Sequence, residues 1–203
     1  MNRQFQRAAV VLLTALPLAI GCEDGATSPR TPDAGTDQLP AFEAGPAAAA
    51  DRMLFQVRLG PLGGTTSHGI VHLEIAGGYL TVSTLGEGLE PLQHIPQHIH
   101  KNPTCDPGGD ILINLDESLT VAGESAPVGA AFPVSNGGGV LNYHASRSLD
   151  DLLQAVNTYL GANLPSVEAL VSWLDLDNRN VHMHVPFGPP FPAVNCGAVE
   201  QLK

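Results

Sequence analysis

The sequence predicts a mainly β protein, a Greek-key β-sandwich or barrel with one or two short helices. From residue 52 onward, short apolar or alternating runs are separated by clusters of glycine, proline and asparagine. Such runs are typical of strands joined by turns, and many short strands in one chain favour a sandwich or barrel. A single longer stretch near residue 150 has apolar residues at helical spacing instead.

Eight strands are expected between residues 52 and 203. Each has β-branched or other apolar residues, and the turns between them contain Gly-Gly, Pro-Gly-Gly, Asn-Gly-Gly-Gly or Pro-Pro. These residues interrupt strands because they favour turn conformations or lack a backbone donor. The expected strands are Met53 to Leu59, Gly69 to Ile75, Tyr79 to Thr84, Gln97 to Lys101, Ile111 to Leu115, Gly139 to Ala145, Asn180 to Val185 and Ala193 to Val199.

Two helices are expected between the sixth and seventh strands. Residues 148–160 begin with Ser148 as the N-cap, carry acids in the first turn and end before Gly161. These are the usual signals of a helix start and stop. A second, short helix is expected from Pro165 through Ser172. We expect both helices to cover an end or an edge of the sandwich, because an open edge strand invites pairing with another chain.

The first 21 residues have the pattern of an export signal. Two arginines precede an apolar run from Ala8 to Ile20, which is short for a membrane span. The stretch LAIGC resembles the lipobox of bacterial lipoproteins, with Ala19 where leucine is commoner. This resemblance implies cleavage before Cys22 and lipidation of that cysteine. The alternative is an ordinary secretory signal that is cut beyond Cys22.

Residues 22–51 are predicted to be a flexible tether between the lipid and a domain at residues 52–203. The tether is rich in proline, alanine, glycine and acid, and it has almost nothing to bury. Several acyl chains on Cys22 would anchor the protein stably to a membrane. We therefore expect an exported lipoprotein of the bacterial cell envelope, on the periplasmic or outer-surface side.

The net charge excludes nucleic acid as a partner. The chain has a formal charge of −11, and loss of the signal removes Arg3 and Arg7 and no acid, which gives −13. Binding to phosphates requires clustered Lys and Arg. The sequence indicates no particular protein partner.

The cysteines favour one disulfide. The chain contains three cysteines, and assignment of Cys22 to the lipid leaves Cys105 and Cys196. In an exported protein two remaining cysteines favour one disulfide. The alternative, two cysteine metal ligands, lacks a C-x-x-C spacing.

Two His-x-His pairs are the candidate metal ligands. His98 and His100 share one face of an expected strand, as do His182 and His184. Two such pairs on neighbouring strands would supply three or four nitrogens, a set suited to copper or zinc. The other interpretation is that they are polar side chains on a solvated strand face. The other four histidines, His68, His72, His94 and His144, are expected at the surface or the rim of the core.

Three segments resemble known families. The segment GLEPLQHIPQHIHKNPTCD and the hairpin before it resemble the CHRD (chordin-type) domain. The segment NVHMHVPFGPPFPAVNCGAVE is similar to the closing part of bacterial CHRD-like proteins and of Cu/Zn superoxide dismutases, and FPVSNGGGVLNYHASRSLDDLL resembles a CHRD-like strand that leads into a helix. The likeness covers most of residues 52–203 and implies a superoxide dismutase-like fold.

The dismutase pattern implies that His98, His100 and His184 are copper ligands and that Cys105 pairs with Cys196. His182 has no counterpart in the family and is expected as a fourth ligand or as a group that supports the ligands.

The chain also departs from the dismutase pattern. No histidine follows His100 where the enzymes place the one that bridges copper and zinc, and the histidine-aspartate zinc loop is absent. Ala193 occupies the position of the arginine that guides superoxide in those enzymes.

These departures favour two interpretations over a copper-dependent dismutase-like enzyme. The first is a non-enzymatic, lipid-tethered CHRD-type module with a binding or structural role, with or without a bound metal. The other is a protein that captures copper or zinc without turnover; the dismutase-like enzyme remains an alternative. Copper is the first choice of ion and zinc the second, and no catalytic residue is assigned.

Overall fold

The described part of the chain folds into eight strands and two α-helices. The computed structural model describes residues 52–106, 109–125, 131–185 and 192–203; the predicted signal, Cys22 and the tether lie outside these residues. The elements are β1 (Met53–Pro61), β2 (His68–Ala76), β3 (Tyr79–Glu87), β4 (Gln97–His100), β5 (Ile111–Asn114), β6 (Leu141–Ser148), α1 (Leu149–Tyr159), α2 (Val167–Leu174), the 3-10 helix η2 (Leu176–Asn178), β7 (Asn180–His184) and β8 (Ala193–Leu202). The predicted mainly β class with two short helices is confirmed.

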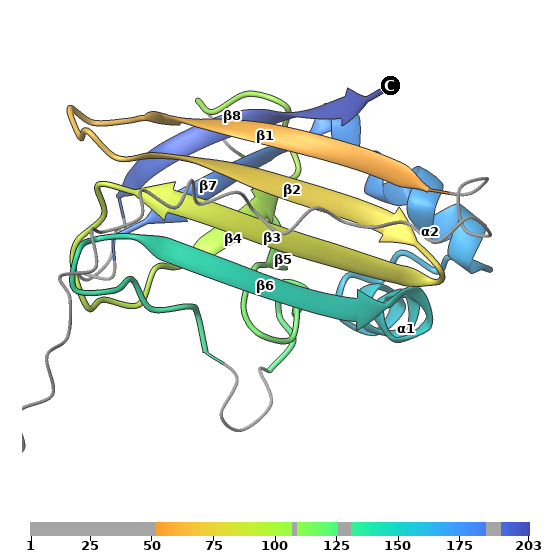
Figure 1. Ribbon diagram of the computed structural model, residues 1–203. Coiled ribbons are helices and arrows are strands. Elements are labelled where there is room, and N and C mark those ends of the chain that lie inside the picture. Colours follow the sequence, from red (N-terminus) through yellow and green to blue (C-terminus); the bar gives the residue numbers. More distant parts are fainter. Residues whose placement is uncertain (1–51, 107–108, 126–130, 186–191) are drawn as a thin grey trace, which may run out of the picture. The chain divides into compact units, whose positions relative to one another are not determined.

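The strands form one curled antiparallel sheet in the order β5-β4-β7-β8-β1-β2-β3-β6. Strands far apart in the sequence become neighbours, as where β4 lies beside β7 and β8 beside β1. This is the connectivity expected of a Greek key. Figure 1 shows β1, β2, β3 and β6 forming one layer and β4, β5 and β7 the other, and β8 pairs with strands of both layers.

The core lies between the two layers. In β1 the buried residues alternate with outward ones, and the register places Phe55 opposite Leu73 and Val57 opposite Val71. Opposed residues share a face of the sheet, so their side chains pack together on the inner side. Burial of each contributes roughly 1.5–3 kcal/mol relative to exposure.

Both helices lie at one end of the sheet, as predicted (Figure 1). Helix α1 begins at its predicted cap, where the Ser148 hydroxyl accepts a hydrogen bond from the Asp151 N–H at 3.1 Å. Helix α2 begins two residues later than expected, because the Ser166 hydroxyl caps it through the Ala169 N–H. Leu170 and Leu174 of α2 are fully buried in the core. None of the described helices is long and apolar enough to span a bilayer.

Candidate metal centre

Strands β4 and β7 bring the two His-x-His pairs onto one face of the sheet. The strands pair antiparallel, with His98 directly opposite His182. Directly opposed residues share a face, and every second residue along a strand returns to it. The other face carries Ile99 and Met183, which are fully buried in the core. The histidine face is therefore the outer face of this layer.

Both strands have an irregularity at their second histidine. The register between β4 and β5 shifts between Ile99 and His100, and that between β7 and β8 shifts between Met183 and His184. Bulges occur frequently next to functional sites, where they redirect a side chain. The shifts are consistent with histidine rings that must converge rather than stand parallel.

Loop segments cover the histidines of β4, so these two side chains are buried although they face away from the core. The Phe132 ring packs edge-on against His98, with centroids 5.4 Å apart. The Gly109 carbonyl oxygen accepts a hydrogen bond from His100 Nδ1 at 2.9 Å. As a result His98 is 9% exposed and His100 is 6% exposed.

Three of the rings converge on one point. Ring nitrogens of His98, His100 and His184 lie within 4.8 Å of one another. Nitrogens that share one ion at about 2.0–2.1 Å must be closer, so the rings would have to close by on the order of 1 Å. The fourth ring, of His182, lies beside this group, with its centroid 4.4 Å from that of His100.

Several nitrogens of the cluster have no hydrogen-bond partner within the described part of the chain. These atoms are His98 Nδ1, His100 Nε2 and His182 Nε2, and all three are buried. A carbonyl oxygen can only accept, so the bond to Gly109 places the proton of the neutral His100 ring on Nδ1. His100 Nε2 therefore presents a lone pair, as in metal-bound histidines whose other nitrogen donates to a carbonyl.

The surroundings lower the pKa of three of the four histidines, His98, His100 and His182, and so favour their neutral form. Burial, and then repulsion from the three neighbouring histidines, lowers the pKa of His98 to about 3. Burial, and then repulsion from His100 and His184, lowers the pKa of His182 to about 4. Burial also lowers the pKa of His100, although the Gly109 carbonyl and Asp110 act in the opposite direction. Neutral imidazole is the form that binds a metal ion.

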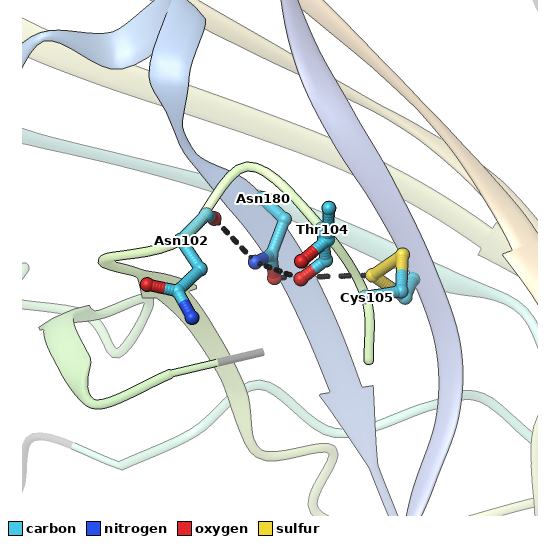
Figure 2. The surroundings of a disulfide bond; sticks show 5 residues. Asn102, Thr104, Cys105 and Asn180 are labelled. Atoms are coloured by element: carbon cyan, nitrogen blue, oxygen red, sulfur yellow. Dashed lines mark hydrogen bonds between the residues drawn. A yellow bond between two sulfur atoms is a disulfide. The ribbon is translucent and has the colours of Figure 1, made fainter. Parts of the chain in front are cut away.

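A disulfide joins Cys105, in the loop after β4, to Cys196 of β8 across 91 residues, with Cα atoms 5.8 Å apart. The predicted disulfide is thus present. Figure 2 shows the Asn180 side chain beside this loop; its Nδ2 donates to the carbonyl oxygens of Asn102 at 2.5 Å and Thr104 at 2.9 Å. The covalent bond and these hydrogen bonds together hold the loop against β7 and β8.

The close packing of β8 against β1 explains why glycine occupies position 197, directly after Cys196. A side chain at Gly197 would collide with the Arg58 carbonyl oxygen of β1 and press on the Val57 side chain. Only glycine lets β8 approach β1 closely at this point.

The structure brings the four predicted ligand residues together and leaves the other histidines elsewhere. His68, His94 and His144 are exposed and His72 is half-buried, as expected. The sequence prediction did not include Phe132 or Gly109. Phe132 reaches the site from a loop far along the chain, and the loop that contains Gly109 has no pattern that indicates its contact with His100. It also omitted Asn180, although its position two residues before His182 places it on the same strand face.

Comparisons with known proteins give a structural likeness. Among solved structures the chain is similar to a variant of superoxide dismutase 5 from Candida albicans, with 14% sequence identity and a TM-score of 0.43, over 72% of this chain and 88% of that one. No family model matches the chain, and no curated protein matches it. The fold is defined here by the chain's own strand order and register.

Proposed function

We propose that this protein is an exported, non-enzymatic β-sandwich module of CHRD type that binds one copper ion, or zinc as second choice, through His98, His100 and His184. The observation that supports it is the convergence of the three ring nitrogens within 4.8 Å, with the His98 and His100 side chains buried. Burial of unpaired polar atoms costs free energy, and an ion that binds there would offset it.

The donor set suits copper and zinc. Neutral imidazole is a good ligand for both ions, and sites of this kind generally bind Cu²⁺ more tightly than Zn²⁺. His182 lies 5.7 Å from His184 between ring centroids, close enough to act as a fourth ligand or to support the others. A bound copper ion would supply one-electron redox chemistry, and zinc would supply Lewis acidity.

A binding role fits the surroundings better than dismutation. Attraction of a small anion favours positive potential near the metal. The chain instead carries a formal charge of −11, and Ala193 stands where the resemblance places a guiding arginine. Phe132 and the loop at Gly109 also restrict access to the two histidines of β4. These features support retention of the ion rather than turnover.

The proposed location is the cell envelope, with the protein anchored to a membrane through lipid on Cys22 and the tether 22–51. The Cys105–Cys196 disulfide supports an extracytoplasmic location, because structural disulfides are typical of oxidising compartments. The excess of acidic residues supports the absence of a nucleic-acid partner.

Elemental analysis tests the proposal. The purified full chain is loaded with copper or zinc and desalted, and we expect about one equivalent to remain. His98→Ala with His100→Ala should remove it. The matched control, His68→Ala with His144→Ala, changes two exposed histidines and should retain the ion. Retention of no ion by the unmodified protein would refute the proposal.

If copper is retained, the rate of superoxide consumption separates binding from catalysis. A loaded protein that is no faster than free copper supports the binding role. Consumption well above that of free copper would favour the dismutase-like alternative.

A further inference from the structure

The disulfide lies directly beside the fourth histidine. His182 of β7 is opposite Cys196 of β8 in the strand register. A ring nitrogen of His182 and the sulfurs of Cys105 and Cys196 lie within 4.8 Å of one another. His182 is 6% exposed, and its Nε2 has no hydrogen-bond partner among the described residues. A ring nitrogen of the buried His182 is thus held next to both sulfurs.

We propose that reduction of this disulfide creates a second metal site, in which Cys105, Cys196 and His182 bind zinc or cuprous copper. Thiolates are soft ligands that select these ions, and the ligand in each case is the deprotonated sulfur. The two sulfurs have no such capacity while they are bonded to each other. The site is therefore controlled by the redox state of the protein, and it does not depend on the ion proposed for the other histidines.

The geometry requires only a local change. Two sulfurs on one tetrahedral zinc ion, each at about 2.3 Å, lie roughly 3.7 Å apart, compared with about 2.0 Å in a disulfide. Cys196 is fixed in a strand, whereas Cys105 lies in a largely exposed loop that can make the adjustment. The hydrogen bonds from Asn180 to this loop are independent of the disulfide and keep Cys105 near after reduction.

Three protein ligands leave the fourth position of a tetrahedral ion to water. His100, whose ring centroid lies 4.4 Å from that of His182, remains a ligand of the ion proposed for His98, His100 and His184.

The reductant is a dithiol. Its first thiolate attacks the sulfur of Cys105. This residue is more accessible than Cys196, which is only 5% exposed. The protein S–S bond breaks, a mixed disulfide forms at Cys105, and Cys196 leaves as a thiolate. The second thiol of the reductant displaces Cys105 and closes the reductant into its own disulfide. Two electrons pass to the protein, and zinc binding releases the protons of the two thiols.

Cobalt(II) is a spectroscopic probe for this site. The full chain with Cys22→Ser contains Cys105 and Cys196 as its only cysteines. It is compared in oxidised form and after treatment with dithiothreitol that is then removed without air. We expect an ultraviolet thiolate-to-cobalt charge-transfer band, with about one additional equivalent bound, only in the reduced protein. Absence of the band after reduction would refute the proposal.

Two variants show which side chains are involved. His182→Ala should weaken cobalt binding to the reduced protein by about tenfold or more, since it removes a ligand. An unchanged titration would mean that the thiolates bind cobalt without His182, and it would refute the proposed site. His98→Ala with His184→Ala should keep the band. If the unmodified oxidised protein holds no ion while the reduced protein shows the band, the proposed function is rejected and this site stands.

Thermal unfolding provides a readout that does not depend on the band. Zinc should raise the midpoint of the reduced protein by several degrees, because an ion that binds only the folded state stabilises it. Cys105→Ser with Cys196→Ser should show a smaller increase, due only to zinc at His98, His100 and His184. If zinc does not stabilise the reduced protein more than this variant, the proposal fails.

Discussion

Removal of the disulfide should lower the stability of the metal-free domain substantially. The bond closes a loop of 91 residues. In the chain-entropy model, a loop of this length restricts the unfolded chain by about 4.6 kcal/mol at 25 °C. A domain of this size loses roughly 2–4 °C in midpoint for each kcal/mol, so Cys105→Ser with Cys196→Ser should lower the midpoint by about 9–18 °C.

The fold itself should survive this change. The Asn180 side chain still donates to the loop at Asn102 and Thr104, and the pairing of β7 with β8 does not involve the sulfurs. We therefore expect native circular dichroism at low temperature and a single transition at a lower midpoint.

Circular dichroism melting, with and without a reducing agent and in the presence of a chelator, measures the effect. Reduced unmodified protein should match the double-serine variant, and the variant should not respond to the reductant. A midpoint shift below about 3 °C would refute the reasoning, since it corresponds to only about 1 kcal/mol. A variant that still responds to the reductant would show that a bond other than Cys105–Cys196 contributes.

Two further predictions follow from the structure and a third from the sequence. The stability of the metal-free domain should fall as the pH decreases below about 6.5: the folded pKa values of His98 and His182 are lowered to about 3 and about 4, so the unfolded chain binds more protons in this range. At pH 5 the loss should be about 2 kcal/mol for each histidine, and a urea unfolding free energy equal at pH 7 and pH 5 would contradict it. Gly197→Ala should destabilise the domain by about 1–3 kcal/mol or more, because its methyl group meets the Arg58 carbonyl, and urea unfolding measures this. Cys22→Ser should release the proposed lipoprotein from membranes into the soluble fraction on ultracentrifugation, and unchanged sedimentation would reject the lipid anchor.

Most of the fold could be predicted from the sequence, because alternation and turn residues are local signals. All eight strands occur where expected, and Ser148 caps α1 as expected. The errors are at strand ends. β8 continues to Leu202, three residues beyond its last predicted position, since its exposed end pairs with β1 through the backbone. Backbone pairing with a distant strand leaves no pattern in the side chains.

The candidate site could be predicted only in part. Alternation places His98 with His100 and His182 with His184, but it does not show that β4 and β7 are neighbours, which the family resemblance supplied. Alternation also does not show that the histidine face is the outer one and is covered by loops. Phe132 lies 34 residues along the chain from His98, and contacts of this kind depend on the whole topology.

The energetics of the cluster indicate why these histidines require an explanation beyond packing. Each buried polar atom without a partner costs about 1–3 kcal/mol, and three nitrogens of the cluster are in this state among the described residues. The total is comparable to the roughly 4.6 kcal/mol contributed by the disulfide that joins the covering loop to β8. Apolar side chains at the same positions would avoid this cost in a domain whose only requirement was stability. The disulfide thus offsets the cost of the unpaired ring nitrogens of His98, His100 and His182. Neutral imidazoles that present such nitrogens are the form in which a protein holds ligands ready for a metal ion.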